Sequence, residues 1–297
     1  MPIFGNYGQR RGGGGGGRWI IAVVIALVGI IGYFAKEKVF NPETGESYRR
    51  AMNVDEQKAL GLQAAQQMIP QMGGEVPPSR DADAALVDEV GERLVRNTGA
   101  AKTDFAGNFN FYLVNDPNTI NAFALPGGQV SITRGLMNQL ENEAQLAGVL
   151  GHEIGHVIAE HSAQQMAKGQ LGQVLATAVG VGASGEDGAG RYAGVAAAMA
   201  AQMVNLKYGR DDESQSDNIG LKYMAQAGYD PAEMLGVMRI LAEASKGGKQ
   251  PEFMSSHPHP ETRIQTIKEF LEKNKDELSK LTLTKGRDLS ADPRPER

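Results

Sequence analysis

The fold is decided by the sequence His152-Glu153-Ile154-Gly155-His156. Because an α-helix makes one turn in about 3.6 residues, His152 and His156 lie on the same helix face, where both imidazoles can reach one metal ion. Glu153 lies beside them, where it can accept a proton from a water molecule that the metal activates. The motif therefore predicts a zinc-dependent hydrolytic centre on a helix.

The residues around this motif also predict a helix. Asn142 and Gln145 have the spacing of a capping box, which satisfies free N–H groups at a helix start. Apolar residues then recur at helical spacing from Ala144 to Ile158. Such a face is normally buried, and two histidines and a glutamate there would be costly without a metal ion or hydrogen-bond partners. The alternative is a surface helix that carries these residues by chance.

Two histidines do not complete a zinc site, so a third ligand must lie elsewhere in the chain. In one class of zinc enzymes a third histidine follows six residues after the second, but that position is Ser162 here. His161 comes one residue earlier and is predicted to be a structural histidine. The chain contains no cysteine, which argues against the closed type of structural zinc site.

A glutamate from a second helix is the other common third ligand. Glu213 and Asp217 are four residues apart on one predicted helix, so they share a face. Glu213 would bind zinc, and Asp217 would accept the second ring N–H of a ligand histidine. An acidic stretch of this kind is also typical of a solvated helix start, because acidic residues suit helix N-termini.

Four separated stretches carry a resemblance to a known family. In order, they are residues 121–128, 148–161, 210–217 and 256–263. Together they resemble the gluzincin family that includes CAAX prenyl endopeptidases and heat-shock membrane proteases, metallopeptidase family 48. They are most like its single-anchor or periplasmic bacterial members. The resemblance covers about residues 50–275.

This resemblance implies an α+β fold that is mainly α-helical, with a zincin-like catalytic domain, a small β-sheet and one zinc ion per chain. The implied zinc ligands are His152, His156 and Glu213. The implied catalytic base is Glu153. The sequence departs from the family at Ser216, where relatives often carry alanine, but this residue touches no proposed ligand.

The N-terminal region is predicted to lie outside the catalytic domain. Residues 1–18 are rich in glycine and arginine and are expected to be disordered. Residues 19–35 form an uncharged apolar run of about 25 Å as a helix, so an uncleaved transmembrane anchor is expected. Basic residues flank this run on both sides and leave its orientation open. The resemblance implies an inner-membrane protein with a periplasmic catalytic domain.

The remaining chain is predicted to form one catalytic domain over residues 50–281 and a disordered tail over residues 282–297. Helical spacing is expected at residues 54–69 and 83–97 before the motif, and at residues 260–281 near the end. Short strands are expected at residues 109–114, 121–125 and 129–133. The Ala/Gly-rich residues 171–206 predict a packed helical hairpin, which could form a flap or an oligomer contact.

A peptide substrate binds in an extended conformation and needs hydrogen-bond partners for its backbone. An exposed strand edge provides these partners and does not require a particular substrate sequence. We expect this edge at Asn121, Ala122, Phe123 and Ala124, beside the zinc helix. The alternative is an ordinary core strand.

His257 and His259 lie among prolines, which hold the backbone extended and stiff before the last helix. The resemblance falls on His257 and on Arg263, and it leaves His259 as the weaker candidate. His257 could stabilise the transition state, occupy the open zinc position as a latch, or only pack. Arg263 would support the transition state or this loop.

The chain carries a net charge of −5, without a basic stripe, which makes nucleic acid an improbable partner. These observations together predict a membrane-anchored zinc metalloendopeptidase that cleaves unfolded or misassembled proteins in envelope quality control. The alternative is an inactive peptidase fold that serves as a chaperone or assembly module. Loss of Glu153 or of a zinc ligand would indicate the alternative, and the sequence retains all of them.

Overall fold

The computed structural model describes residues 15–183, 208–246 and 251–290. Its fold is mainly helical with two small sheets, which confirms the predicted α+β class. The helices are α1 (Gly15–Ala35), α2 (Val54–Met68), α3 (Ala82–Arg96), α4 (Arg134–Met137), α5 (Glu143–Ile158), α6 (His161–Ala183), α8 (Arg210–Gln226), α9 (Met234–Ser245), α10 (Glu252–Ser256), α11 (Pro260–Lys273) and α12 (Lys275–Leu278). The strands are β1 (Lys38–Asn41), β2 (Glu46–Arg49), β3 (Asn110–Val114), β4 (Ala122–Leu125) and β5 (Gln129–Thr133).

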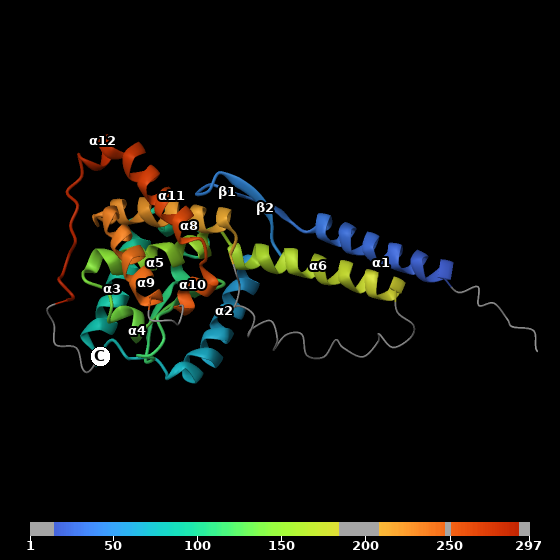
Figure 1. The fold of residues 1–297 in the computed structure, drawn as a ribbon, viewed down its shortest axis with the longest axis horizontal. Helices are drawn as coiled ribbons and strands as arrows, with labels where there is room; N and C mark the ends of the chain where they lie inside the picture. Colours follow the sequence, from blue (N-terminus) through green and yellow to red (C-terminus); the bar gives the residue numbers. More distant parts are fainter. Residues whose placement is uncertain (1–14, 184–207, 247–250, 291–297) are drawn as a thin grey trace, which may run out of the picture.

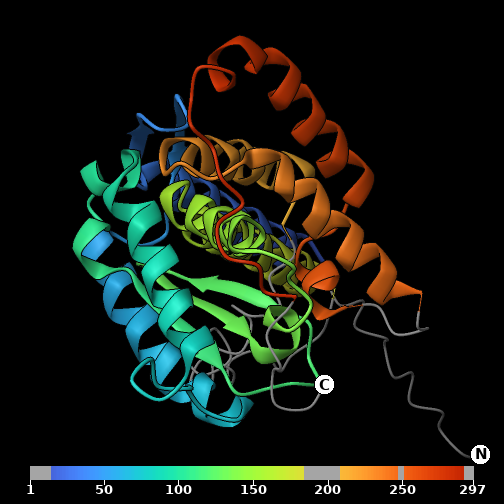
Figure 2. The ribbon, with the colours of Figure 1, turned by 90° about the vertical axis from the view of Figure 1, so that its left-hand side faces the viewer.

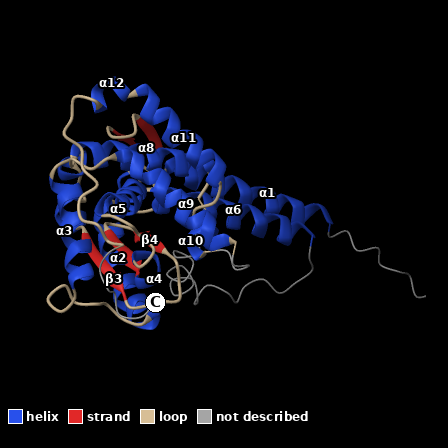
Figure 3. Ribbon diagram, turned by 60° about the vertical axis from the view of Figure 1, so that its left-hand side comes forward, coloured by secondary structure: helices blue, strands red, loops and turns tan. Residues whose placement is uncertain are grey.

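The central sheet has three strands in the order β3-β5-β4 and is surrounded by helices (Figure 3). β5 runs parallel to β3 and antiparallel to β4, with Ala124 opposite Val130. β4 and β5 are joined through Gly127 and Gly128, whose φ angles of 78° and 109° suit glycine. The predicted strands are thus present to within a residue or so, and β4 is an edge strand.

The zinc-motif helix α5 lies at the centre of the domain. Figure 2 shows it between the three-stranded sheet and α8. Every residue of α5 is buried. The side chain of Asn142 caps its first turn by accepting from the N–H of Gln145 at 3.0 Å. Gln145 accepts from the N–H of Glu141 instead, so only half of the predicted capping box forms.

Glycines allow α5 and α8 to approach closely. A Cβ atom on Gly155 would lie 2.9 Å from the Cα of Ser216, and one on Gly220 would lie 2.9 Å from the backbone nitrogen of His152. Any larger residue would therefore push the two helices apart. This close contact places the acidic residues of α8 beside the histidines of α5.

Helices α1 and α6 project together from the domain (Figure 1). Lys36 at the end of α1 donates to Gln170 of α6 at 3.0 Å. The predicted hairpin over residues 171–206 is described only to Ala183, where α6 is one continuous helix, and its second arm lies outside the described residues.

The predicted anchor, residues 19–35, lies within α1. None of the helices in the described ranges combines the length and the apolar character that a membrane crossing requires. Apolar side chains of α1 are nevertheless open to solvent, with Ile20, Val28 and Ile31 between 64% and 66% exposed. Most of the predicted tail over residues 1–18 lies outside the described residues, although α1 begins within it at Gly15.

The segment after α12 packs on the start of α5. The N–H groups of Glu143 and Ala144 donate to the carbonyls of Arg287 and Lys285, at 3.0 and 2.9 Å. Leu289 is only 7% exposed. The prediction of a disordered tail is therefore wrong for these residues, because they satisfy N–H groups that the first turn of α5 leaves free. The predicted last helix over residues 260–281 is also divided, into α11 and α12.

Candidate active site

His152 and His156 face the same point from adjacent turns of α5. Their Nε2 atoms are 3.0 Å apart, and the side chains are 0% and 2% exposed. Nδ1 of His152 donates to Oδ1 of Asp217 at 2.8 Å, so the Nε2 atom of a neutral His152 carries a lone pair. When His156 carries its proton on Nδ1, two lone pairs face each other across this distance, and a cation between them removes their repulsion.

Glu213 reaches the same point from the first turn of α8. Its Oε1 atom is 3.4 Å from Nε2 of His156, and its Oε2 atom is 3.6 Å from Nε2 of His152. The Oε2 atom is buried and lacks a hydrogen-bond partner among the described residues. The structure thus brings together the three side chains that the sequence proposes as zinc ligands.

His257, which follows α10, completes the cluster. Its Nδ1 atom is 3.2 Å from Nε2 of His152 and 3.1 Å from Oε1 of Glu213. The ligand atoms of His152, His156, Glu213 and His257 all lie within 4.8 Å of one another. Ligand atoms around a tetrahedral zinc ion at about 2.0–2.1 Å are about 3.3 Å apart. The spacing, the donor types and the unpartnered carboxylate oxygen fit one zinc ion.

Asp217 and Arg263 lie behind His152. Arg263 is fully buried and donates to Asp217 through Nη2 at 2.7 Å and through Nε at 3.0 Å. Burial alone would raise the pKa of Asp217, but the guanidinium of Arg263 and His152 lower it below its usual value. Asp217 is therefore held as a carboxylate. Arg263 thus pairs with Asp217 and also lies 3.5 Å from Oε2 of Glu213 through its Nε atom.

Glu153 lies beside the cluster, with its Oε1 atom 3.5 Å from Nε2 of His257. Its side chain is 1% exposed, and neither carboxylate oxygen has a hydrogen-bond partner in the part of the chain that the structure describes. Burial raises the pKa of Glu153 from 4.5 to about 7. A general base works best when its pKa lies near the working pH. The environment of Glu153 is thus suited to proton transfer.

The family is shown by comparison with known proteins. A family model described as Peptidase family M48 matches residues 81–271. The chain belongs to peptidase family M48. Together with the cluster of three histidines and a glutamate, this makes it a zinc-dependent hydrolase.

Three relatives illustrate the range of this similarity. The Beta-barrel assembly-enhancing protease of Yersinia pestis is 32% identical over 235 residues, which are 75% of this chain and 45% of that protein. The Mitochondrial metalloendopeptidase OMA1 of Schizosaccharomyces pombe is 28% identical over 259 residues, 86% of this chain and 72% of that protein. Metalloprotease YcaL of Escherichia coli (strain K12) is 29% identical over 203 residues, which are 65% of this chain and 74% of that protein. The chain spans about half the length of the barrel-assembly relatives.

The M48 site is closed in this structure. All four residues of β4 are buried, and the N–H of Phe253 in α10 donates to the carbonyl of Ile120, just before β4. The rings of Phe253 and Tyr208 cover His257, with centroids 4.5 and 5.4 Å from it. In this arrangement α10 contacts the chain just before β4, and α2 packs against β4 itself. Sequence reasoning did not find Phe253 or Tyr208, because isolated aromatic residues carry no motif.

His161 does not belong to the zinc cluster, as the sequence predicts, but it is closer to the cluster than expected. Its Nδ1 atom is 2.9 Å from Nδ1 of the ligand candidate His156. The prediction assumed a continuous helix, whereas α5 ends at Ile158 and Glu160 has a φ of 54°. This break turns the start of α6 back towards the zinc motif. Glu160 itself carries no sequence signal for such a break.

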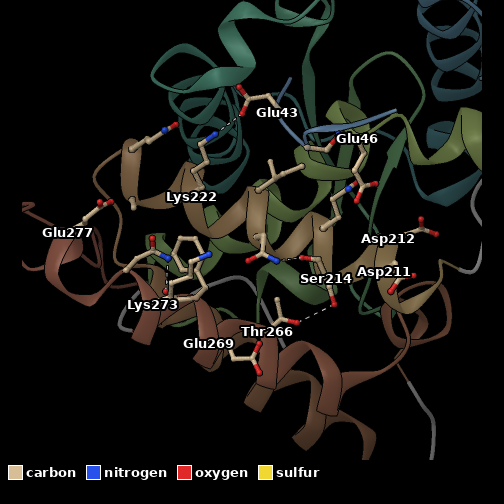
Figure 4. A pocket seen from close by; sticks show the side chains of 18 of the residues that line it. Glu43, Glu46, Asp211, Asp212, Ser214, Lys222, Thr266, Glu269, Lys273 and Glu277 are labelled. Carbon is tan, nitrogen blue, oxygen red and sulfur yellow. Dashed lines mark hydrogen bonds and ion pairs between the residues drawn. The ribbon is translucent and has the colours of Figure 1, made fainter. Parts of the chain in front are cut away.

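A polar groove of about 1060 Å³ is lined by parts of the β1–β2 region, α8 and α11 (Figure 4). Acidic side chains predominate among its labelled residues, including Asp211, Asp212 and Glu269. Neither Glu153 nor any of the four clustered residues lines it. The groove is therefore separate from the catalytic centre of this M48 peptidase.

Proposed function

We propose that this chain is a membrane-attached zinc endopeptidase that cleaves protein substrates with Glu153 as the base. The observation that carries the proposal is the convergence of His152, His156 and Glu213 beside Glu153, whose carboxylate oxygens accept no hydrogen bond from the described residues. His152, His156 and Glu213 would hold the zinc ion, which would supply polarisation of a water molecule and of the scissile carbonyl. Glu153 accepts a proton from the attacking water and delivers it to the leaving amine, which contributes about 10²–10⁴-fold to the rate.

His257 has a regulatory position in this scheme. A catalytic zinc site keeps one coordination position open for water or substrate, whereas a closed site has four protein ligands. The Nδ1 atom of His257 lies at ligand spacing from both His152 and Glu213. Of the roles that the sequence leaves open, this position favours the latch, in which His257 must withdraw before a water molecule can be activated.

The substrates are proposed to be unfolded or misassembled envelope proteins. The Yersinia relative is named for enhancing β-barrel assembly, and unfolded barrel proteins offer extended strands. β4, from Ala122 to Leu125, is an edge strand next to α5, so a substrate strand could pair with it. Asn121 precedes this edge, and its buried Oδ1 atom lacks a partner among the described residues.

Attachment to the inner membrane is proposed for α1, with the catalytic domain in the periplasm. Support comes from the exposed apolar side chains of α1, which lie around most of its circumference and leave a single stripe in contact with α6. A protein partner would cover one face of such a helix, whereas lipid can surround it.

Two variants test the catalytic assignment together. Glu153→Gln should retain zinc, because Glu153 is not a ligand, but should lose casein hydrolysis by about 10²–10⁴-fold. Glu213→Ala should lose zinc and activity together, because it removes a ligand. Zinc is measured by elemental analysis and turnover with labelled casein at saturating zinc. Near-normal turnover of zinc-loaded Glu153→Gln would reject Glu153 as the base. It would not support a chaperone or assembly role, because these roles involve no peptide hydrolysis.

A further inference from the structure

His161 begins α6 directly behind the zinc-facing histidines. Its side chain is 1% exposed, and both ring nitrogens have partners. Nδ1 lies 2.9 Å from Nδ1 of His156, and Nε2 lies 3.0 Å from Oε1 of Gln215 in α8. Its first nitrogen therefore contacts a ligand candidate, and its second nitrogen is fixed by the helix that carries Glu213.

The positions of the protons follow from this geometry. His156 faces Glu213 and His152 through Nε2, so a neutral His156 that binds zinc there carries its proton on Nδ1. That proton needs an acceptor, and Nδ1 of His161 is in position to provide a lone pair. His161 then carries its own proton on Nε2 and donates it to Oε1 of Gln215. Each of the two short contacts thereby has one donor and one acceptor.

We propose that His161 is a positioning residue that fixes the tautomer and the ring orientation of His156. This rests on the proposed function, in which His156 is a zinc ligand. His161 touches neither zinc nor substrate. It acts by accepting the Nδ1 proton of His156, which keeps the lone pair of Nε2 directed at the metal.

The two ligand histidines are thus supported in different ways. His152 donates to the carboxylate of Asp217, whose charge is balanced by Arg263. His156 donates to a neutral imidazole that is backed by the neutral amide of Gln215. A carboxylate at position 161 would add another buried negative charge close to Glu213, at a considerable desolvation cost. A neutral acceptor avoids this cost.

The groups around His161 agree with a neutral acceptor. The hydroxyl of Ser216 lies 3.4 Å from Nδ1 of His161 and can donate to the same lone pair. Asp212 is the carboxylate that faces His161 from α8, with Oδ1 at 3.9 Å from Nε2, on the side where His161 carries its proton.

Substitutions at position 161 in the full-length chain separate this role from packing. His161→Asn places an acceptor oxygen near the position of Nδ1, whereas His161→Gln places it near Nε2, and His161→Leu fills the space without an acceptor. The control Leu94→Ala opens a cavity in α3, away from the site, and tests general destabilisation. Zinc affinity is measured by competition with a chelating dye. The metal environment is measured by the visible spectrum of the cobalt(II) form, and apo-protein stability by urea unfolding.

We expect His161→Leu to weaken zinc binding by about 10–100-fold and to shift the cobalt spectrum. His161→Asn should recover most of the affinity, and His161→Gln should recover less. Leu94→Ala should lower apo-protein stability with unchanged zinc affinity. Affinity of His161→Leu within about twofold of wild type, with an unchanged cobalt spectrum, would overturn the proposal.

If His161→Leu does not fold, the zinc affinity of His161→Asn is compared with that of His161→Gln. Equal zinc affinities of these two variants would also overturn the proposal. A wild-type chain that binds no zinc would instead reject the proposed function, so the two failures are distinguishable.

Discussion

At the scale of single residues, substitution of His257 tests whether the zinc site is held shut. If this residue acts as a latch, His257→Ala should weaken zinc retention by at least about tenfold, because a protein contact with the metal is lost. The same variant should cleave casein faster than wild type at saturating zinc, since water gains the open position. Steady-state kinetics over a zinc titration measure both effects.

The matched control is His259→Ala, which removes the other histidine of the same proline-bounded loop, a residue outside the cluster of ligand candidates. It should leave zinc binding and kinetics unchanged. A lower kcat with little change in KM for His257→Ala would show transition-state stabilisation instead. Unchanged zinc affinity and kinetics would leave His257 as a packing residue.

At the scale of helices and strands, the start of α3 offers a test of stability. Asp81 caps α3 by accepting from the N–H of Ala84 at 2.9 Å, and its Oδ2 atom lies 2.6 Å from Nη2 of Arg134. Partial burial opposes ionisation of Asp81, but the Ala84 N–H and Arg134 outweigh it and lower its pKa below 3.8. A lowered folded pKa stabilises the fold above the unfolded pKa, and this contribution is lost as the pH falls through the folded pKa.

Asp81→Ala should therefore cost about 1–2 kcal/mol at pH 7, mostly from the lost cap. Asp81→Asn keeps a capping oxygen and loses the ion pair, so it should cost less than about 1 kcal/mol. Below about pH 4 the difference between wild type and Asp81→Asn should shrink progressively, because Asp81 takes up its proton first in the unfolded chain and only at lower pH in the folded one. Urea unfolding of the zinc-free proteins measures these differences. A constant difference between wild type and Asp81→Asn over this pH range would contradict the ion-pair assignment.

Elements with a repeating pattern could be predicted from the sequence, and elements set by distant partners could not. α5, β4 and β5 follow from periodicity and spacing. The family resemblance implied that Glu213 joins the two histidines, so the metal-facing residues were found. The break at Glu160 depends on donors far along the chain. Tyr48 and Gln57 donate to the carboxylate of Glu160 at 2.9 and 2.6 Å. The sequence around Glu160 contains no pattern that predicts these two hydrogen bonds. For the same reason the position of His161 and the packing of residues 284–289 were missed.

At the scale of the whole molecule, Glu160 joins the N-terminal segment to the catalytic helix. Arg50, just after β2, forms an ion pair with Glu160 at 3.3 Å, and Asn41 of β1 donates to the carbonyl of Ile158 at 2.6 Å. The β1–β2 hairpin that follows α1 is thereby fastened to the end of α5. If α1 lies in a membrane, the zinc motif is held at a fixed distance from the membrane surface.

The last prediction concerns this attachment. In cells that express the full-length chain, the protein should remain in the membrane fraction after alkaline carbonate extraction, and protease added to spheroplasts should digest the catalytic domain. The double variant Val24→Glu and Val28→Glu places charges on two α1 side chains that are 52% and 64% exposed. Because a buried charge is costly in lipid, this variant should move to the soluble fraction with casein hydrolysis intact. Leu62→Glu, at a side chain of α2 that is 45% exposed, is the matched control and should stay with the membrane.

Wild-type protein that is released by carbonate would refute the membrane anchor. Protection from protease until the spheroplasts are lysed would place the catalytic domain on the cytoplasmic side.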